Sequence, residues 1–77
     1  MRSKTTTQQR VLRYIREFVH AHGYGPTVRE IRDALGISST SVVHSHLNRL
    51  ERQWLITREP GLARTIRPAP RERPWGH

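Results

Sequence analysis

Apolar residues recur at helical intervals in the first third of the sequence. These positions are Val11, Leu12, Ile15, Phe18 and Val19. Thr6 and Gln9 precede them at the spacing of a capping box, in which each residue's side chain accepts a hydrogen bond from the other's backbone. Gly23 follows, where glycine commonly ends a helix. The pattern therefore predicts a helix from about residue 7 to 22.

A second helix is delimited more sharply, within the stretch TVREIRDALG at residues 27–36. Thr27 and Glu30 repeat the capping-box spacing, and Gly36 ends the pattern. The positions predicted to be buried are Val28, Ile31, Ala34 and Leu35. A helix this short and amphipathic is not stable alone, so it must pack on its neighbours.

A third helix is predicted to start after a cap at Ser38 or Ser39 and to reach about Arg52. At about 100° per residue, one narrow sector holds its apolar residues, and we expect this core face to continue beyond the helix end. The sector contains Val43, Leu47 and Leu50, followed by Trp54. A short helix, a glycine-containing turn and a longer helix are typical of a helix-turn-helix.

The last ordered segment is predicted to be a β-hairpin. Two short runs, Leu55 to Arg58 and Arg64 to Arg67, flank a turn that contains Pro60 and Gly61. Because an isolated two-stranded ribbon is marginally stable, it needs a third short strand or must pack onto the helices through Leu55 or Ile56 and through Ile66. Behind a helix-turn-helix, such a hairpin is a wing.

The fold expected from these patterns is mainly α with a small β-hairpin, a three-helix winged helix-turn-helix over residues 1–68. The chain has 77 residues, which is one small domain. Residues 69–77 are rich in proline and arginine, so we expect them to form a disordered tail.

Composition adds a strong positive charge to this picture. The sequence has 14 Lys and Arg against 6 Asp and Glu, a net charge of +8. Most of this charge is arginine, which suits phosphate and guanine contacts, so nucleic acid is the favoured partner. The alternative is that the charge only keeps the domain soluble. No stretch is apolar enough for a signal peptide or a membrane span, so we expect a cytoplasmic protein with no membrane partner.

Metal binding and catalysis are not expected. There is no cysteine, and His44 and His46 lie about 200° apart on the third helix, so one ion cannot be held by both. His20 and His22 fall in the last turn of the first helix, where a cation complements the helix dipole. A nuclease that uses His44 and Glu51 is rejected because no carboxylate cluster exists to hold a metal. No cofactor is predicted.

The outward side of the third helix is the candidate binding surface. It carries Ser41, Ser45, Asn48 and Arg52, flanked by His44 and Arg49. Short hydrogen-bonding side chains allow a helix backbone to approach base edges in the major groove, and Val42 is suited to a thymine methyl. A plain helix cap explains one serine but not all of them. Arg49 and Arg52 are either phosphate contacts or an ordinary solvated face. Arg64, in the wing, is predicted to contact the DNA backbone.

Three motifs together resemble a known family, the DNA-binding domain of LexA-type SOS repressors. They are G-Y-x-P-T-V-R-E-I, L-G-I-S-S and V-H-x-H-L-x-x-L-E, within a similarity from about Thr6 to Pro68. By this resemblance, the third helix reads an operator, and His46 has a structural position that faces the fold. The residues at the reading positions are Ser39, Ser41, Val42, His44 and Ser45.

The sequence also departs from this family. A LexA-type repressor continues through a cleavable Ala-Gly linker into a peptidase domain that supplies the dimer contact, whereas this sequence ends at His77. The sequence contains no Ala-Gly, so self-cleavage is not expected. The chain is either a complete small protein or a truncated gene product, and its proline-rich ending favours the first. Trp54 stands where glycine is common, and a left-handed conformation there would cost about 1 kcal/mol more. Gly25 replaces a frequent proline and is expected to loosen its turn.

The expected function is sequence-specific binding of double-stranded DNA and regulation of transcription, by repression. A free monomer or weak dimer is expected, paired on inverted half-sites, since one small domain gives weak specificity. The alternative is a winged-helix module for protein interaction, an antirepressor or architectural factor. The predicted DNA-binding residues are Ser39, Ser41, Val42, His44, Ser45, Asn48, Arg49, Arg52 and Arg64.

Overall fold

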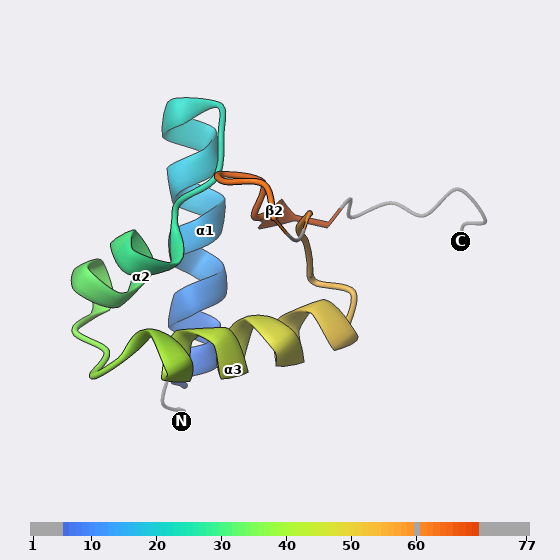
Figure 1. The fold of residues 1–77 in the computed structure, drawn as a ribbon. Coiled ribbons are helices and arrows are strands. Elements are labelled where there is room, and N and C mark those ends of the chain that lie inside the picture. Colours follow the sequence, from blue (N-terminus) through green and yellow to red (C-terminus); the bar gives the residue numbers. More distant parts are fainter. Residues whose placement is uncertain (1–5, 60, 70–77) are drawn as a thin grey trace, which may run out of the picture.

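The first helix begins and ends where its capping residues predict. The computed structural model describes residues 6–59 and 61–69, and α1 spans Thr7–His22 (Figure 1). The backbone N–H of Gln9 donates to Thr6 Oγ1 at 3.1 Å, and the Thr6 N–H donates to Gln9 Oε1 at 3.0 Å. At the other end Gly23 has a φ of 82° and donates to the Val19 carbonyl. The predicted bounds of this helix are confirmed.

The next two helices form the predicted helix-turn-helix. α2 spans Val28–Leu35, and its capping box joins Thr27 to Glu30 through bonds of 2.9 and 3.1 Å. Gly36 ends it with a φ of 67°. α3 spans Thr40–Arg52, and the Oγ of Ser39 accepts from the N–H of Val42, so Ser39 is the cap of the two candidates. α3 crosses one end of α1, and α2 lies beside both (Figure 1).

The core is filled from all three helices and from the wing. Its buried members are Val11, Ile15, Ile31, Val43, Leu47, Leu50, Ile56 and Ile66. The predicted core face of α3 is confirmed, and so is the packing of the wing through its two isoleucines. The prediction that Ala34 is buried is wrong, because this residue is exposed at the edge of the apolar side of α2.

The prediction that Trp54 extends the core face of α3 is also wrong. Although the helical periodicity places it there, 74% of its surface is exposed. Its φ is 63°, so the helical angle no longer applies beyond Arg52. The N–H of Leu55 donates to the Leu50 carbonyl, and that of Trp54 to the Glu51 carbonyl. This pair of bonds is a Schellman motif, whose left-handed position usually holds glycine. Trp54 takes the left-handed conformation at a cost of about 1 kcal/mol.

The wing is shorter than predicted, and its second strand starts later. β1 spans Ile56–Thr57 and β2 spans Arg67–Pro68, paired antiparallel with Ile56 opposite Pro68. The predicted strand from Arg64 to Arg67 is wrong because Arg64 has a left-handed φ of 61°. Its carbonyl instead accepts a 3.2 Å bond from the N–H of Gly25, in the turn before α2.

Gly25 is buried in this contact, and the expectation of a looser turn stays a prediction. A Cβ placed on Gly25 would lie 1.9 Å from the carbonyl oxygen of Ile66. The absence of a side chain is what allows the wing backbone to lie against the turn.

The hairpin pairing extends one residue past the predicted domain boundary. The N–H of Ala69 donates to the Leu55 carbonyl at 2.9 Å, which continues the pairing after β2. The rest of the predicted disordered tail, residues 70–77, lies outside the described residues. Among the described residues no helix has both the length and the apolar character needed to cross a membrane.

Candidate nucleic-acid interface

The residues predicted on the outward side of α3 share one exposed face. The exposed members are Ser41, Val42, His44, Ser45, Asn48, Arg49 and Arg52. Ser39 is half-buried, and its hydroxyl caps the helix. Since Val43, Leu47 and Leu50 point into the core, this face is turned away from the other helices. We call these eight residues the α3 face.

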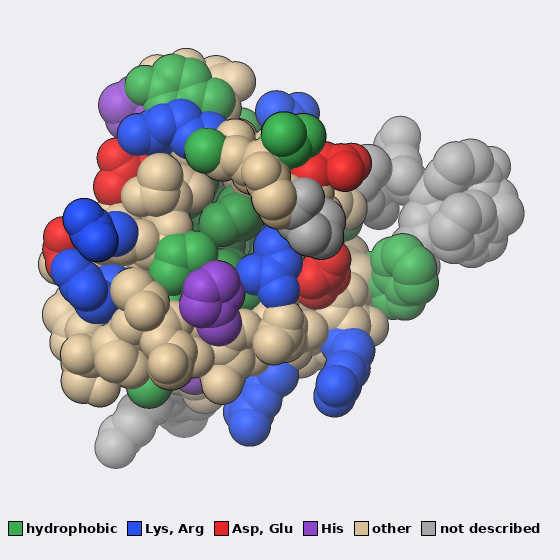
Figure 2. All heavy atoms as spheres, in the orientation of Figure 1, with side chains coloured by type: hydrophobic (Ala, Val, Ile, Leu, Met, Phe, Trp, Pro, Cys, Tyr) green, Lys and Arg blue, Asp and Glu red, His purple; other side chains and the backbone are tan. Residues whose placement is uncertain are grey.

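A hollow lies between α3 and the wing. Its lining residues are Val28, His44, Arg58, Glu59, Gly61, Leu62 and Ile66. The space-filling view shows hydrophobic side chains at the floor of a hollow above α3, with histidine, basic and acidic side chains at its edge (Figure 2). The hollow therefore borders the α3 face on the side of His44.

Arg58 is a residue of this surface whose role sequence reasoning missed. Its Nε donates to Glu51 Oε1 at 3.1 Å, and its Nη2 donates to Asn48 Oδ1. Its side chain is 19% exposed. The arginine thus ties the end of β1 to the last turns of α3. These partners lie 7 and 10 residues away along the chain, across the bend after α3, so no local pattern indicates them.

The contact with Arg58 also fixes the orientation of the Asn48 amide. A guanidinium has donors and no acceptor, so the Asn48 atom that faces it must be the carbonyl oxygen. The NH₂ group of Asn48 therefore points away from Arg58. Because Asn48 is exposed, its two amide donors are open to solvent.

Arg64 lies apart from the α3 face. Its Nη1 and Nη2 donate to the two carboxylate oxygens of Glu30, each at 3.1 Å, and Nη1 also donates to the Gly25 carbonyl at 3.3 Å. The guanidinium lies 5.0 Å from the centre of the Tyr24 ring. Hydrogen bonding from Arg64, followed by that from the Thr27 backbone, lowers the pKa of Glu30. None of these contacts tests the predicted contact of Arg64 with DNA.

The histidines occupy different environments. His44 is exposed, and His46 is half-buried with its Nδ1 atom enclosed and without a hydrogen-bond partner among the described residues. The ring of His22 packs against Phe18 at the end of α1, with centroids 4.1 Å apart and the ring planes tilted by 38°. Within residues 6–59 and 61–69, no three side chains of the metal-binding types lie close enough together to hold an ion.

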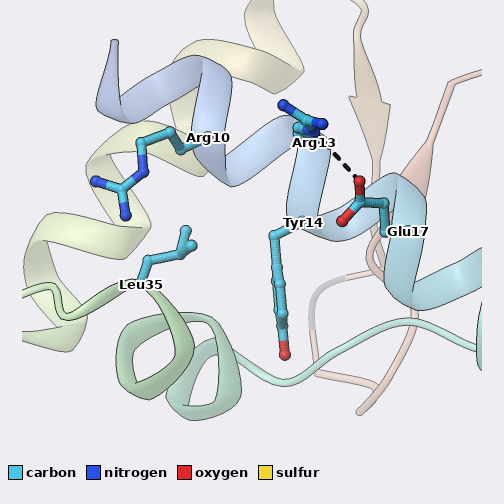
Figure 3. Close-up of a pocket in the computed structure, with 5 residues that line it drawn as sticks. All are labelled: Arg10, Arg13, Tyr14, Glu17 and Leu35. Atoms are coloured by element: carbon cyan, nitrogen blue, oxygen red, sulfur yellow. Dashed lines mark hydrogen bonds and ion pairs between the residues drawn. The ribbon is translucent and has the colours of Figure 1, made fainter. Parts of the chain in front are cut away.

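A shallow depression lies between α1 and α2, away from the predicted residues. Figure 3 shows the side chains of its rim and floor, with the Tyr14 ring extending from α1 towards α2 and the Arg13–Glu17 pair beside it. That pair is 3.2 Å apart, and both side chains are largely exposed. Burial raises the pKa of Tyr14, and the charge of Glu30 adds to this. The depression holds none of the predicted binding residues.

Comparison with known proteins identifies relatives that match most of this chain. A family model for the LexA DNA binding domain matches residues 1–65. The LexA repressor of Enterococcus faecalis is 54% identical over 65 residues, which cover 84% of this chain and 31% of that protein.

Two further LexA repressors give the same result. That of Halalkalibacterium halodurans is 52% identical over 59 residues, 77% of this chain and 28% of that protein. That of Limosilactobacillus fermentum is 46% identical over 69 residues, 90% of this chain and 33% of that protein. The chain thus spans about a third of the length of these relatives.

Proposed function

The chain belongs to the LexA DNA binding domain family, and on that premise we propose that it binds specific sequences of double-stranded DNA and represses transcription by occupying an operator. The observation that carries the proposal is the α3 face, which gathers short polar side chains on the exposed side of the second helix of the helix-turn-helix. A repressor acts at the chromosome, so we place the chain in the cytoplasm of a bacterial cell.

In this proposal α3 lies in the major groove with its N-terminal half against the bases. Ser41 and Ser45 are short enough to let the backbone approach, and His44 reaches a base edge. Val42, which is 37% exposed, offers an apolar contact for a thymine methyl. The cap at Ser39 brings the N-terminus of α3 close to a phosphate.

The second half of α3 is proposed to contact the DNA backbone. Arg49 and Arg52 are exposed in its last turns, further from the groove floor, and are proposed as phosphate contacts. Because one such surface is small, we propose that two copies bind inverted half-sites whose centres lie roughly 10 bp, or a multiple of that, apart. The free chain is then a monomer or a weak dimer.

Titration with salt tests the proposed function. After selection of preferred sites from random duplexes, the affinity for a selected duplex should fall linearly on a log–log plot against salt concentration, because phosphate contacts release counterions. A scrambled duplex should bind far more weakly. The alternative, a protein-interaction module, would show neither a preferred sequence nor this slope.

The orientation of Asn48 predicts which bases it reads. With Oδ1 held by Arg58, the NH₂ group can donate to both guanine O6 and N7 or to thymine O4, but to adenine only through N7. The bidentate pairing with adenine needs Oδ1 as well, and is therefore disfavoured. We expect one position of the selected site to favour guanine or thymine. Asn48→Ala should lower the affinity ratio between the preferred base and the others about tenfold, on the order of 1.4 kcal/mol.

Arg58→Met provides the matched comparison for Asn48. It keeps a long side chain over the hollow but frees Oδ1, so adenine should become accepted at the position that depends on Asn48. Selection of adenine at that position by the unmodified protein would show that the proposed orientation does not apply on DNA.

A further inference from the structure

Arg64 connects the wing to the start of the helix-turn-helix through both its backbone and its side chain. Its carbonyl accepts from the N–H of Gly25, and its guanidinium donates to the carbonyl of the same residue. The guanidinium also lies over the ring of Tyr24 and forms two bonds to Glu30. The left-handed φ of 61° at Arg64 is the conformation in which these contacts coexist.

Glu30 takes part in two structures at once. Its Oε1 accepts from the Thr27 N–H at 2.9 Å, which closes the capping box of α2, and also from Arg64 Nη1 at 3.1 Å. The residue that holds the wing is therefore part of the N-terminal cap of α2. Because α2 packs on α3, the position of the wing relative to the α3 face is linked to this cap.

The wing is attached a second time on its other side. Arg58, at the end of β1, donates to Asn48 and Glu51 of α3. One arginine thus ties the first strand to α3, and the other ties the segment before the second strand to α2. Arg58 also lines the hollow that borders the α3 face.

We propose that Arg64 is a positioning residue, which pairs with Glu30 to fix the distance between the wing and the α3 face, and that it does not bind a DNA phosphate. This inference rests on the proposed function. A bidentate arginine–carboxylate pair leaves little of the guanidinium's donor capacity for a phosphate. The Glu30 carboxylate beside it also offsets the attraction of Arg64 for a phosphate, because the partly exposed pair carries no net charge.

Three variants separate positioning from phosphate binding. Arg64→Ala should weaken binding to a selected duplex roughly tenfold while the salt slope stays unchanged. Loss of a phosphate contact would instead lower the slope by about one. Arg64→Lys should weaken binding as well, because lysine cannot form the bidentate pair, whereas lysine would preserve a phosphate contact.

Glu30→Gln gives the sharpest contrast, because the two roles predict opposite signs. If Arg64 positions the wing, the loss of its charged partner weakens binding. If Arg64 binds phosphate, removal of a neighbouring negative charge strengthens binding. Asp33→Asn is the matched control, since Asp33 is also on α2 but pairs with Arg32 and forms no hydrogen bond or ion pair with the described residues of the wing. It should leave the affinity unchanged or slightly raised.

Hydrogen exchange at the Gly25 amide provides a readout that needs no DNA. This amide is protected by the Arg64 carbonyl, so Arg64→Ala and Glu30→Gln should both speed its exchange, and Asp33→Asn should not. Three results would each overturn the inference. They are unchanged exchange in the first two variants, a salt slope lower by one in Arg64→Ala, and tighter DNA binding by Glu30→Gln. If the unmodified protein binds no DNA, the proposed function fails while the exchange result still decides whether Arg64 anchors the wing.

Discussion

Gly25→Ala is expected to lower the free energy of unfolding by about 3 kcal/mol, the upper part of the range for overpacking a close contact. The added Cβ would lie 1.9 Å from the Ile66 oxygen, 2.9 Å from its carbonyl carbon and 3.1 Å from its nitrogen. All three are backbone atoms, and the Ile66 side chain is anchored in the core at 7% exposure. The wing must therefore move as a unit or the turn must open.

The loss is large for a domain of 77 residues, whose total stability is roughly 4 to 12 kcal/mol. Urea unfolding followed by circular dichroism measures it. Gly61→Ala is the control, because Gly61 has a φ of 86° and open space where its Cβ would lie, so only the left-handed conformation costs energy, about 1 kcal/mol. Equal losses in the two variants would mean that the wing does not pack against the turn as described.

His44→Ala should weaken binding to a selected duplex by roughly 1 to 3 kcal/mol, the range for a contact with a base edge. The side chain is exposed on the α3 face, so the melting temperature should hardly change. Discrimination at one base pair should relax, which a panel of single-base variants of the duplex would show. A similar loss on every duplex would assign His44 to the backbone instead.

His46→Ala should have the opposite profile, although only one residue separates the two. Its side chain is half-buried, and its enclosed Nδ1 has no partner among the described residues, so its contribution to stability comes from packing. We expect a loss of on the order of 1 to 2 kcal/mol in unfolding free energy, with unchanged affinity for DNA at a temperature where the variant is folded. Identical behaviour of the two variants would contradict the division of α3 into two faces. Added zinc should alter neither result.

The helices could be predicted from the sequence because their signals are local. Thr6 with Gln9 and Thr27 with Glu30 act over three residues, and Gly23 and Gly36 supply left-handed conformations at the ends. The α3 face followed from the same periodicity, since the positions of Val43, Leu47 and Leu50 determine which side chains are turned outward.

The wing could be predicted only as a hairpin, because its details depend on contacts that are distant in the sequence. Arg64 pairs with Glu30, 34 residues away, and Gly25 excludes a side chain because of Ile66. Neither contact has a sequence signal on its own. Trp54 could be placed at a glycine position by resemblance, yet its exposure depends on the left-handed turn that ends α3. Helix periodicity and capping signals therefore predicted the α3 face better than they predicted the wing beside it.

Chemical-shift mapping on a selected duplex tests the central claim, that the α3 face reads DNA, most directly. In the ¹⁵N-labelled protein, the largest amide changes should fall between Ser39 and Asn48, and the side chains of Ser41, His44 and Ser45 should show contacts with base protons. Amides of the depression between α1 and α2, near Arg10 and Tyr14, should change little. Changes centred on that depression, with α3 unaffected, would contradict the account.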